Sequence, residues 1–343
     1  MNMEPMEVLS HFALSGAALD CSPYGNGHIN ATFLARTTAG RYILQRISAR
    51  AFADIPGLMD NIAAVTAHLR QKDPDPRHSL RLIPTREGGW FWREEDGECW
   101  RCTAFVEGSR TPLAFLSPAE FREIGGAWGR FLALLSDFPV DALRRTGPCY
   151  HDAPERYRQF RAALENDPLD RAGALGAEIE GYLFRETDAA QLQTLLDAGE
   201  LPLRLTHNDT KMDNILLDTA TGRALCVLDL DTVMPGLIAY DFGDAVRSQA
   251  VNGRGCVDTQ MLSAFAGGFL GAYPELTRPE RESRALGVWT MTVECGLRYL
   301  TDYLEGERFF AVRRPGQCLE RARAHLRLAR DMERRRGEME RSI

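Results

Sequence analysis

The sequence lacks any long apolar run and any excess of positive charge. No stretch approaches the ~18 consecutive apolar residues that a membrane-spanning helix needs, so no membrane contact is expected. The formal net charge is -7 and the pI is about 5.6, which leaves no basic surplus to neutralise the phosphates of a nucleic acid. The first residues carry Glu4 and Glu7 instead of the basic start of a secretory signal, so no such signal is expected.

Paired metal-binding cysteines are also missing. Of the 8 cysteines, only Cys99 and Cys102 have C-x-x-C spacing, and no second pair of Cys or His accompanies them. A zinc site is therefore not predicted. The cysteines are interpreted as reduced thiols, which indicates a cytoplasmic protein.

The chain of 343 residues is longer than a single hydrophobic core usually supports, which favours two lobes. From Tyr24 to about Phe105 the sequence has strand character: ATFLART and GRYILQRI are two short runs separated by a turn signal, and a helix is expected from Pro56. After Gly108 helical patterns dominate, beginning with the capping pattern at Ser117. The prediction is an α+β fold with a small β-rich lobe over residues 1–106 and a larger, mainly helical lobe over residues 107–343.

One short stretch, LTHNDTKMDN, concentrates polar groups in the helical half. Its spacing His207-x-Asp209-x-x-x-x-Asn214 is typical of phosphoryl transfer. One carboxylate orients an attacking hydroxyl and accepts its proton, and an amide oxygen five residues later reaches a Mg²⁺ ion on the nucleotide phosphates. The alternative is that Asp209 and Asn214 only form an Asx turn.

A second carboxylate follows the apolar strand Cys226–Leu228. Mg²⁺ sites usually combine one or two carboxylates with phosphate oxygens and water, so Asp229 is expected to be the other metal ligand. A carboxylate at the end of a buried strand is costly unless a cation or other groups satisfy it. Asp231 lies two residues further and is expected to project from the same face.

These residues carry a resemblance to a known family. HNDTKMDN followed by VLDLDTVMPGLIAYDFGD is similar to the phosphotransferase branch of the kinase-like superfamily, which contains aminoglycoside, choline and homoserine kinases. The chain resembles the anomeric N-acetylhexosamine 1-kinases more closely, on the stretches YGNGHINATF, YILQRI, DLDTVMPG and ECGLRYLTDYLEGERFF. The resemblance implies a two-lobed kinase-like fold, with ATP and Mg²⁺ as cofactors.

The resemblance also implies roles in and around the loop. Asp209 would be the catalytic base, and Asn214 and Asp229 would bind the metal. His207 would brace the loop, and Asp241 would hold its backbone. Lys211 would either neutralise charge on the transferred phosphoryl group, as part of the nucleotide site, or be a solvated loop lysine.

On the nucleotide side the sequence departs from the kinase pattern. Gly25, Asn26 and Gly27 form a partial glycine-rich loop, which would cover phosphates or be a plain hairpin turn. The strand that should carry a lysine has Gln45 and Arg46 instead, and the residues from Gly57 to Arg70 contain no Glu to pair with such a lysine. Alternation along a strand allows only one of Gln45 and Arg46 into the cleft. The connector around Phe105 would hold the adenine through its backbone.

On the acceptor side, Glu294, Arg298 and Asp302 are spaced four residues apart on one expected helix. They would bind the acceptor's polar groups by resemblance, or form an exposed ladder of ion pairs. Asp231 and His28 are further acceptor-binding candidates.

The function predicted from the sequence is an ATP- and Mg²⁺-dependent kinase that phosphorylates the anomeric hydroxyl of an N-acetylhexosamine (GlcNAc or GalNAc). The alternatives are a kinase of an aminoglycoside, homoserine or a choline-like alcohol, and a catalytically inactive nucleotide-binding pseudokinase. The expected partners are ATP and a small sugar, with no nucleic acid and no membrane, and the protein is expected to be a monomer or homodimer.

Overall fold

A computed structural model of the chain describes residues 3–25, 29–112, 116–147, 151–247 and 249–343. The chain divides into two compact, discontinuous units. The first unit comprises Met1–Pro112, Leu134–Pro148 and Asp213–Met234, and the second comprises Leu113–Ala133, Cys149–Met212 and Pro235–Ile343. These units do not coincide with the expected contiguous ranges, because two later segments belong to the first unit.

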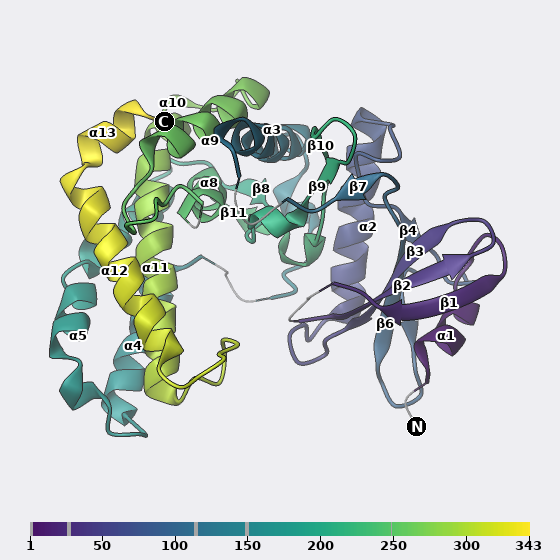
Figure 1. Ribbon diagram of the computed structural model, residues 1–343, viewed down its shortest axis with the longest axis horizontal. Helices are drawn as coiled ribbons and strands as arrows, with labels where there is room; N and C mark the ends of the chain where they lie inside the picture. Colours follow the sequence, from purple (N-terminus) through teal and green to yellow (C-terminus); the bar gives the residue numbers. More distant parts are fainter. Residues whose placement is uncertain (1–2, 26–28, 113–115, 148–150, 248) are drawn as a thin grey trace. The chain divides into compact units, whose positions relative to one another are not determined.

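The first unit is built mainly from strands (Figure 1). In chain order it contains α1 (Pro5–Val8), β1 (Ala18–Pro23), β2 (Ala31–Thr37), β3 (Arg41–Ile47), α2 (Ile55–Lys72), β4 (Leu82–Ile83), β5 (Trp92–Arg93), β6 (Cys99–Ala104), β7 (Ser109–Arg110), β9 (Ile215–Asp218) and β10 (Ala224–Val227). The expected hairpin is confirmed as β2 and β3, and the helix expected from Pro56 is confirmed as α2, whose first turn is capped by the Asp54 carboxylate.

The main sheet of this unit is antiparallel, with the order β1-β2-β3-β6-β4, and β5 pairs with the edge of β6. Alternate residues face a hydrophobic core on one side, where Tyr42, Leu44, Trp100 and Cys102 pack beneath α1 and the turn that follows it. The residues between them therefore project from the opposite face. A smaller sheet has the order β10-β9-β7.

The second unit is mainly helical. It contains α3 (Pro118–Leu134), α4 (Ala153–Asn166), α5 (Gly176–Leu183), α6 (Glu186–Ala189), α7 (Gln191–Asp197), β8 (Arg204–Thr206), α8 (Ile238–Arg247), α9 (Thr259–Ala272), α10 (Arg278–Glu282), α11 (Arg284–Glu305), α12 (Gln317–Arg334) and α13 (Arg336–Arg341), and β11 (Met234–Gly236) pairs with β8. The α+β class predicted from the sequence is confirmed.

Helices α8 and α11 pack closely because each contributes a glycine where they meet. A Cβ added to Gly243 would lie 2.3 Å from the Gly287 carbonyl oxygen, and one on Gly287 would lie 2.1 Å from the Ala239 carbonyl oxygen. No side chain fits at either position without separating the helices. This close packing fixes Asp241 on α8 relative to Glu294 on α11.

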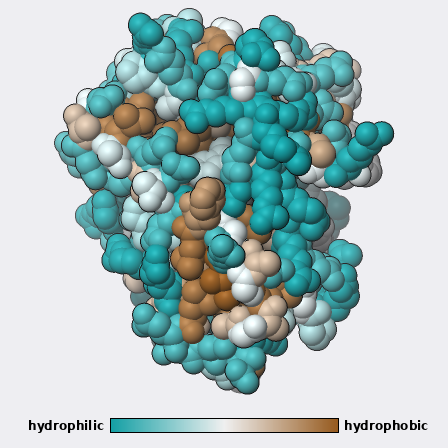
Figure 2. All heavy atoms as spheres, turned by 90° about the vertical axis from the view of Figure 1, so that its left-hand side faces the viewer, coloured by the Kyte–Doolittle hydropathy of each residue, from teal (hydrophilic) through white to brown (hydrophobic). Residues whose placement is uncertain are grey.

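The face of the molecule in Figure 2 is largely hydrophilic, with apolar side chains gathered in its lower half. Within the described part of the chain, no helix combines the length and the apolar character needed to cross a membrane.

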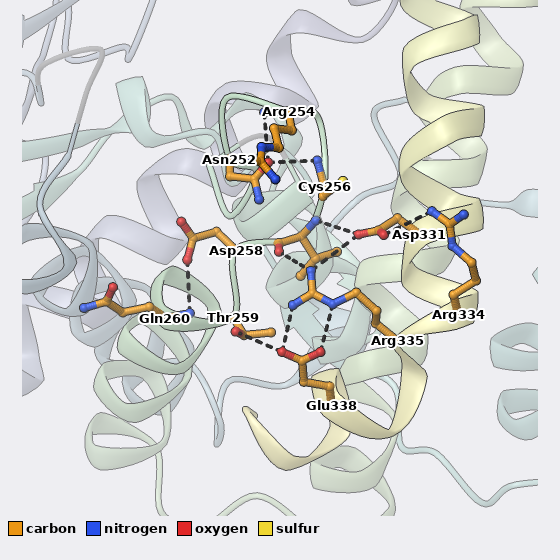
Figure 3. Close-up of polar contacts among 11 residues, drawn as sticks. Asn252, Arg254, Cys256, Asp258, Thr259, Gln260, Asp331, Arg334, Arg335 and Glu338 are labelled. Carbon is orange, nitrogen blue, oxygen red and sulfur yellow. Dashed lines mark hydrogen bonds and ion pairs between the residues drawn. The ribbon is translucent and has the colours of Figure 1, made fainter.

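The loop between α8 and α9 is held by one buried carboxylate of α12 (Figure 3). Asp331 accepts a hydrogen bond from the Val257 backbone N–H at 3.0 Å and is paired with Arg334 and Arg335. Arg335 also donates to the Val257 carbonyl oxygen at 2.6 Å and pairs with Glu338. Both backbone polar groups of Val257 are therefore satisfied by side chains of the C-terminal helices.

We expect Asp331→Ala to lower the free energy of unfolding by about 2 kcal/mol, because it removes a charged acceptor from a buried N–H group. Urea denaturation followed by circular dichroism would measure the change. Glu340→Ala is the matched control, since Glu340 forms an exposed ion pair with Arg336 on the same part of the chain. Its effect should stay under about 0.5 kcal/mol. Equal effects of the two substitutions would contradict the role given to Asp331.

Candidate functional site

The first unit contains a cavity of about 270 Å³. Much of its wall is apolar, formed by Ile43, Ile62, Leu80, Leu82, Val106, Leu216, Leu228 and Leu230. Its polar and charged lining includes Gln45, Arg101, Arg110, Asn214 and Asp229. A mainly apolar pocket with a few charged groups suits a ligand that has a flat apolar part and a charged part.

Phe105 lines this cavity where the chain leaves β6. Its backbone N–H donates to the Arg41 carbonyl oxygen at 3.1 Å, which fixes it to the start of β3. The Arg41 guanidinium lies 4.1 Å from the centre of the Phe105 ring, and Tyr24 meets the ring edge-on. The aromatic ring is therefore held in place by contacts on the sheet.

Asn214 and Asp229 line the same cavity, although fourteen residues separate them in the sequence. The hairpin β9–β10 brings them together, because the Leu228 N–H donates to the Asn214 carbonyl oxygen at 2.8 Å. Asp229 has a left-handed backbone with φ of 57°. Such a conformation is unfavourable for most side chains and is concentrated at functional sites. One carboxylate and one amide oxygen on a shared wall form a donor set that fits Mg²⁺.

In the second unit, the loop after β8 is fastened to the first turn of α8. The Asp241 carboxylate accepts hydrogen bonds from the backbone N–H groups of His207 at 2.7 Å and Asn208 at 2.8 Å. Thr210 donates its hydroxyl to the Asp241 carbonyl oxygen at 2.7 Å, and its N–H donates to the Asp244 carboxylate at 3.0 Å. The loop backbone on both sides of Asp209 is thus fixed by buried groups. The contact of Asp241 is the one that the resemblance implies.

His207 is fully buried, and its ring packs edge-on against Trp128 and Phe131 of α3. The loop reverses direction at Asn208, where φ is 64°. Asp209 follows, half-buried, and its Oδ2 atom lies 2.5 Å from the Lys211 Nζ atom. Lys211 therefore contacts the loop carboxylate, and its expected role at the nucleotide stays a prediction.

On α11, Glu294 is 1% exposed and faces two cationic groups of the segment His151–Arg156. The Glu294 Oε1 atom lies 3.5 Å from His151 Nδ1 and 3.8 Å from Arg156 Nε. His151 Nε2 lies 3.0 Å from the Asn208 carbonyl oxygen. Burial alone would lower the pKa of His151, but the Glu294 carboxylate raises it overall. Glu294 is thus linked through His151 to the loop that carries Asp209.

Arg298 lies one helical turn beyond Glu294. Among the described residues, no carboxylate lies within ion-pair distance of its guanidinium, which rests against Phe309 and Phe310 at 5.5 Å and 5.4 Å from the ring centres. Phe309 is 72% exposed. Burial and the nearby Arg298 charge both lower the pKa of Arg156. The positive charge of Arg298 therefore acts on Arg156.

The structure distinguishes between Gln45 and Arg46. Gln45 lines the cavity, while Arg46 projects from the opposite face of β3 towards Glu98 and Trp100. Of the two residues between which the sequence left the choice open, Gln45 therefore lies on the cavity side and Arg46 does not. Alternation along the strand sets the outcome, because Ile43 lines the cavity and Leu44 faces the core.

Two further assignments are corrected by the partners of the carboxylates. Asp231 lies in a 3₁₀ turn, not on a strand face, and its oxygens accept hydrogen bonds from Arg101 and Asn30. Asp302 accepts the backbone N–H groups of Arg308, Phe309 and Phe310 at 2.8–3.0 Å. Both carboxylates hold the protein's own groups, so neither is retained as an acceptor-binding residue.

Two residues of the expected phosphate loop, Asn26 and Gly27, lie outside the described residues, as does the acceptor-binding candidate His28. Gly25 is described, with a φ of 73° that favours glycine.

Sequence reasoning missed Arg101, His151 and Asp244. Arg101 lines the cavity, His151 contacts the loop carbonyl, and Asp244 binds the loop at Thr210. Asp244 lies one helical turn after Asp241 in the stretch DFGD, which was a usable signal. Arg101 and His151 stand in no motif, since their positions depend on strand pairing and helix packing.

The sequence and the fold are both similar to those of known phosphotransferases and kinases. The sequence model of the phosphotransferase enzyme family matches residues 20–286. The fold is similar to that of an aminoglycoside phosphotransferase from Alicyclobacillus acidocaldarius (16% identity, TM-score 0.69, covering 99% of this chain and 98% of that one). It is also similar to a microcompartment-associated aminopropanol kinase (18% identity, TM-score 0.72, 98% and 97% covered). A choline kinase from Streptococcus pneumoniae is more distant (13% identity, TM-score 0.52, 91% and 93% covered).

Identities this low show a shared kinase-like fold and do not transfer a substrate. The family match is stronger, because it extends over more than half of the chain and includes the loop at Asp209 and the residues Asn214, Asp229 and Asp241. The chain belongs to the phosphotransferase enzyme family.

Proposed function

We propose that this phosphotransferase transfers the γ-phosphoryl group of ATP, with Mg²⁺, to the anomeric hydroxyl of an N-acetylhexosamine. Asp209 would orient the hydroxyl and accept its proton. Asn214 and Asp229 would hold the metal, which would neutralise charge on the phosphates. The observation that carries the choice of acceptor is the surroundings of Arg298.

The cavity of the first unit supports the nucleotide part of the proposal. Its apolar walls and the Phe105 ring suit a purine base, whereas Asn214, Asp229 and Arg101 suit its phosphates and their metal. The intact Asp209, Asn214 and Asp229 speak against an inactive pseudokinase, because nucleotide binding alone needs no base on the acceptor side.

The charges on α11 support a neutral acceptor. The Arg298 charge acts on Arg156 and His151 adds a third basic side chain, while Glu294 lies 3.5 Å from His151 Nδ1 and 3.8 Å from Arg156 Nε. A polycationic aminoglycoside or a quaternary amine would be repelled there. An exposed aromatic ring, Phe309, beside a guanidinium suits a sugar, which presents both C–H groups and hydroxyls.

Homoserine is the second candidate acceptor. A guanidinium binds carboxylates well, and homoserine carries one next to its ammonium group. Arg298 would then bind the carboxylate and Glu294 the ammonium.

A panel of acceptors tests the proposal directly. The protein would be incubated with ATP, Mg²⁺ and GlcNAc, GalNAc, homoserine, choline or an aminoglycoside, and the products followed by ³¹P NMR. We expect a sugar 1-phosphate from a hexosamine and no product from choline or the aminoglycoside. Turnover of homoserine alone would replace the sugar by the second candidate. Absence of turnover with every acceptor and absence of ATP hydrolysis would support the pseudokinase.

We expect Asp209→Asn to lower kcat by about 10²–10⁴ with little change in nucleotide affinity, because the amide cannot accept the hydroxyl proton. Steady-state kinetics and nucleotide titration would separate the two effects. Asp213→Asn is the matched control, since Asp213 is an exposed carboxylate in the same loop. Near-normal turnover of Asp209→Asn with every acceptor would remove Asp209 as the base.

Arg298→Met should raise the KM of the acceptor about 10- to 100-fold and leave the KM of ATP unchanged, because a charged donor to the acceptor is lost. Arg278→Met, at an exposed Arg–Glu pair of α10, is the control for loss of a guanidinium. A change in the KM of ATP alone would contradict the assignment of Arg298 to the acceptor.

A further inference from the structure

The nucleotide cavity needs a cation that the usual lysine does not supply. The chain has only two lysines, Lys72 and Lys211, and neither lines the described cavity. Lys72 ends α2 and pairs with Asp137. A polyphosphate entering this cavity would therefore depend on arginine for fixed positive charge.

Arg101 is the buried arginine of the cavity lining. It lies on β6 directly opposite Gln45 of β3, and Gln45 lies opposite Thr32 of β2. The Arg101 Nε atom donates to Gln45 Oε1 at 2.9 Å, and Gln45 Nε2 donates to Thr32 Oγ1 at 3.1 Å. Three neighbouring strands thus contribute one connected row of polar side chains on the cavity face of the sheet.

Asp231 holds the other end of the guanidinium. Arg101 Nη2 donates to Asp231 Oδ2 at 3.0 Å, and Nη1 donates to Asp231 Oδ1. Asn30 Nδ2 donates to the same carboxylate at 2.8 Å. Arg101 is 5% exposed and Asp231 is 3% exposed, so this is a bidentate ion pair buried within the first unit.

Arg101 stays charged and retains donors for a ligand. Burial alone would lower the pKa of Arg101, but the charge of Asp231, followed by that of Asp229, raises it overall. A guanidinium has five N–H donors, and three of those of Arg101 have partners among the described residues. Two N–H groups remain on a side chain that lines the cavity.

We propose that Arg101 binds the phosphates of the nucleotide in place of a lysine on β3, and that Asp231 and Gln45 are its positioning residues. This proposal rests on the proposed function, because it takes a nucleoside polyphosphate as the ligand of this cavity. It also explains why β3 carries a glutamine here. Gln45 supports the guanidinium from the neighbouring strand instead of contacting the phosphates through a charge of its own.

The pair also connects the sheet to the segment that carries Asp229. Asp231 lies two residues after Asp229, and its contacts with Arg101 and Asn30 hold the 3₁₀ turn Leu230–Thr232. A purely structural ion pair would have this effect alone. The test must therefore separate recognition of phosphates from support of the fold.

Binding of adenosine, ADP and ATP, without acceptor, makes that separation. Affinities would be measured by competition against a fluorescent ATP analogue, with Mg²⁺ and with EDTA. We expect Arg101→Met to weaken ADP and ATP about 10- to 100-fold and to leave adenosine unchanged, because adenosine carries no phosphate. Arg101→Lys should recover part of the loss, and Gln45→Ala should weaken ADP and ATP less than Arg101→Met does.

Two controls keep the result interpretable. Arg36→Met removes an arginine from an exposed Arg–Asp pair on β2 and should change none of the three affinities. Arg101→Met leaves Asp231 buried without its partner, so the double variant Arg101→Met with Asp231→Leu replaces the whole ion pair by apolar side chains. It should show the same selective loss of ADP and ATP.

Equal weakening of adenosine, ADP and ATP in these variants would overturn the proposal, since it would show a structural pair only. Unchanged affinities would overturn it as well. A wild-type protein that binds none of the three ligands would instead refute the proposed function, so the two failures are distinguishable.

Discussion

The candidate chemistry of this protein depends on one buried carboxylate, that of Asp241. It accepts the backbone N–H groups of His207 and Asn208, and so sets the path of the loop immediately before Asp209. A carboxyl group that accepts from two buried N–H groups stabilises a loop that contains a left-handed residue at Asn208. The close packing of α8 against α11 then fixes this anchor relative to Glu294.

In several other places of the structure, a carboxylate accepts hydrogen bonds from backbone N–H groups. Asp302 holds three successive N–H groups beyond α11, and Asp331 holds Val257. Asp231 differs, because its partners are side chains of the sheet, including Arg101. Several aspartates therefore stabilise loops, whereas Asp209 and Asp229 are the carboxylates assigned to the proposed chemistry. An aspartate in a family-like segment is therefore weak evidence for contact with a ligand.

Much of the fold followed from local patterns. The hairpin β2–β3, the helix α2 with Pro56 in its first turn, and the helical second half were read correctly, since periodicity and capping are local properties. The predicted contiguous ranges differ from the two compact units, because the hairpin β9–β10 and the segment Leu134–Pro148 belong to the first unit. Whether a later segment packs onto an earlier unit depends on contacts between residues far apart in the sequence, which local patterns do not encode.

The sequence by itself determined the reaction class, because Asp209, Asn214 and Asp229 stand at spacings that a short loop and one hairpin can realise. Alternation along β3 also determined that only one of Gln45 and Arg46 could line the cavity. Only the tertiary structure decided which one it was, and that Arg101 of a neighbouring strand stands beside it. Strand register and burial place those side chains together, and neither is encoded in a local pattern.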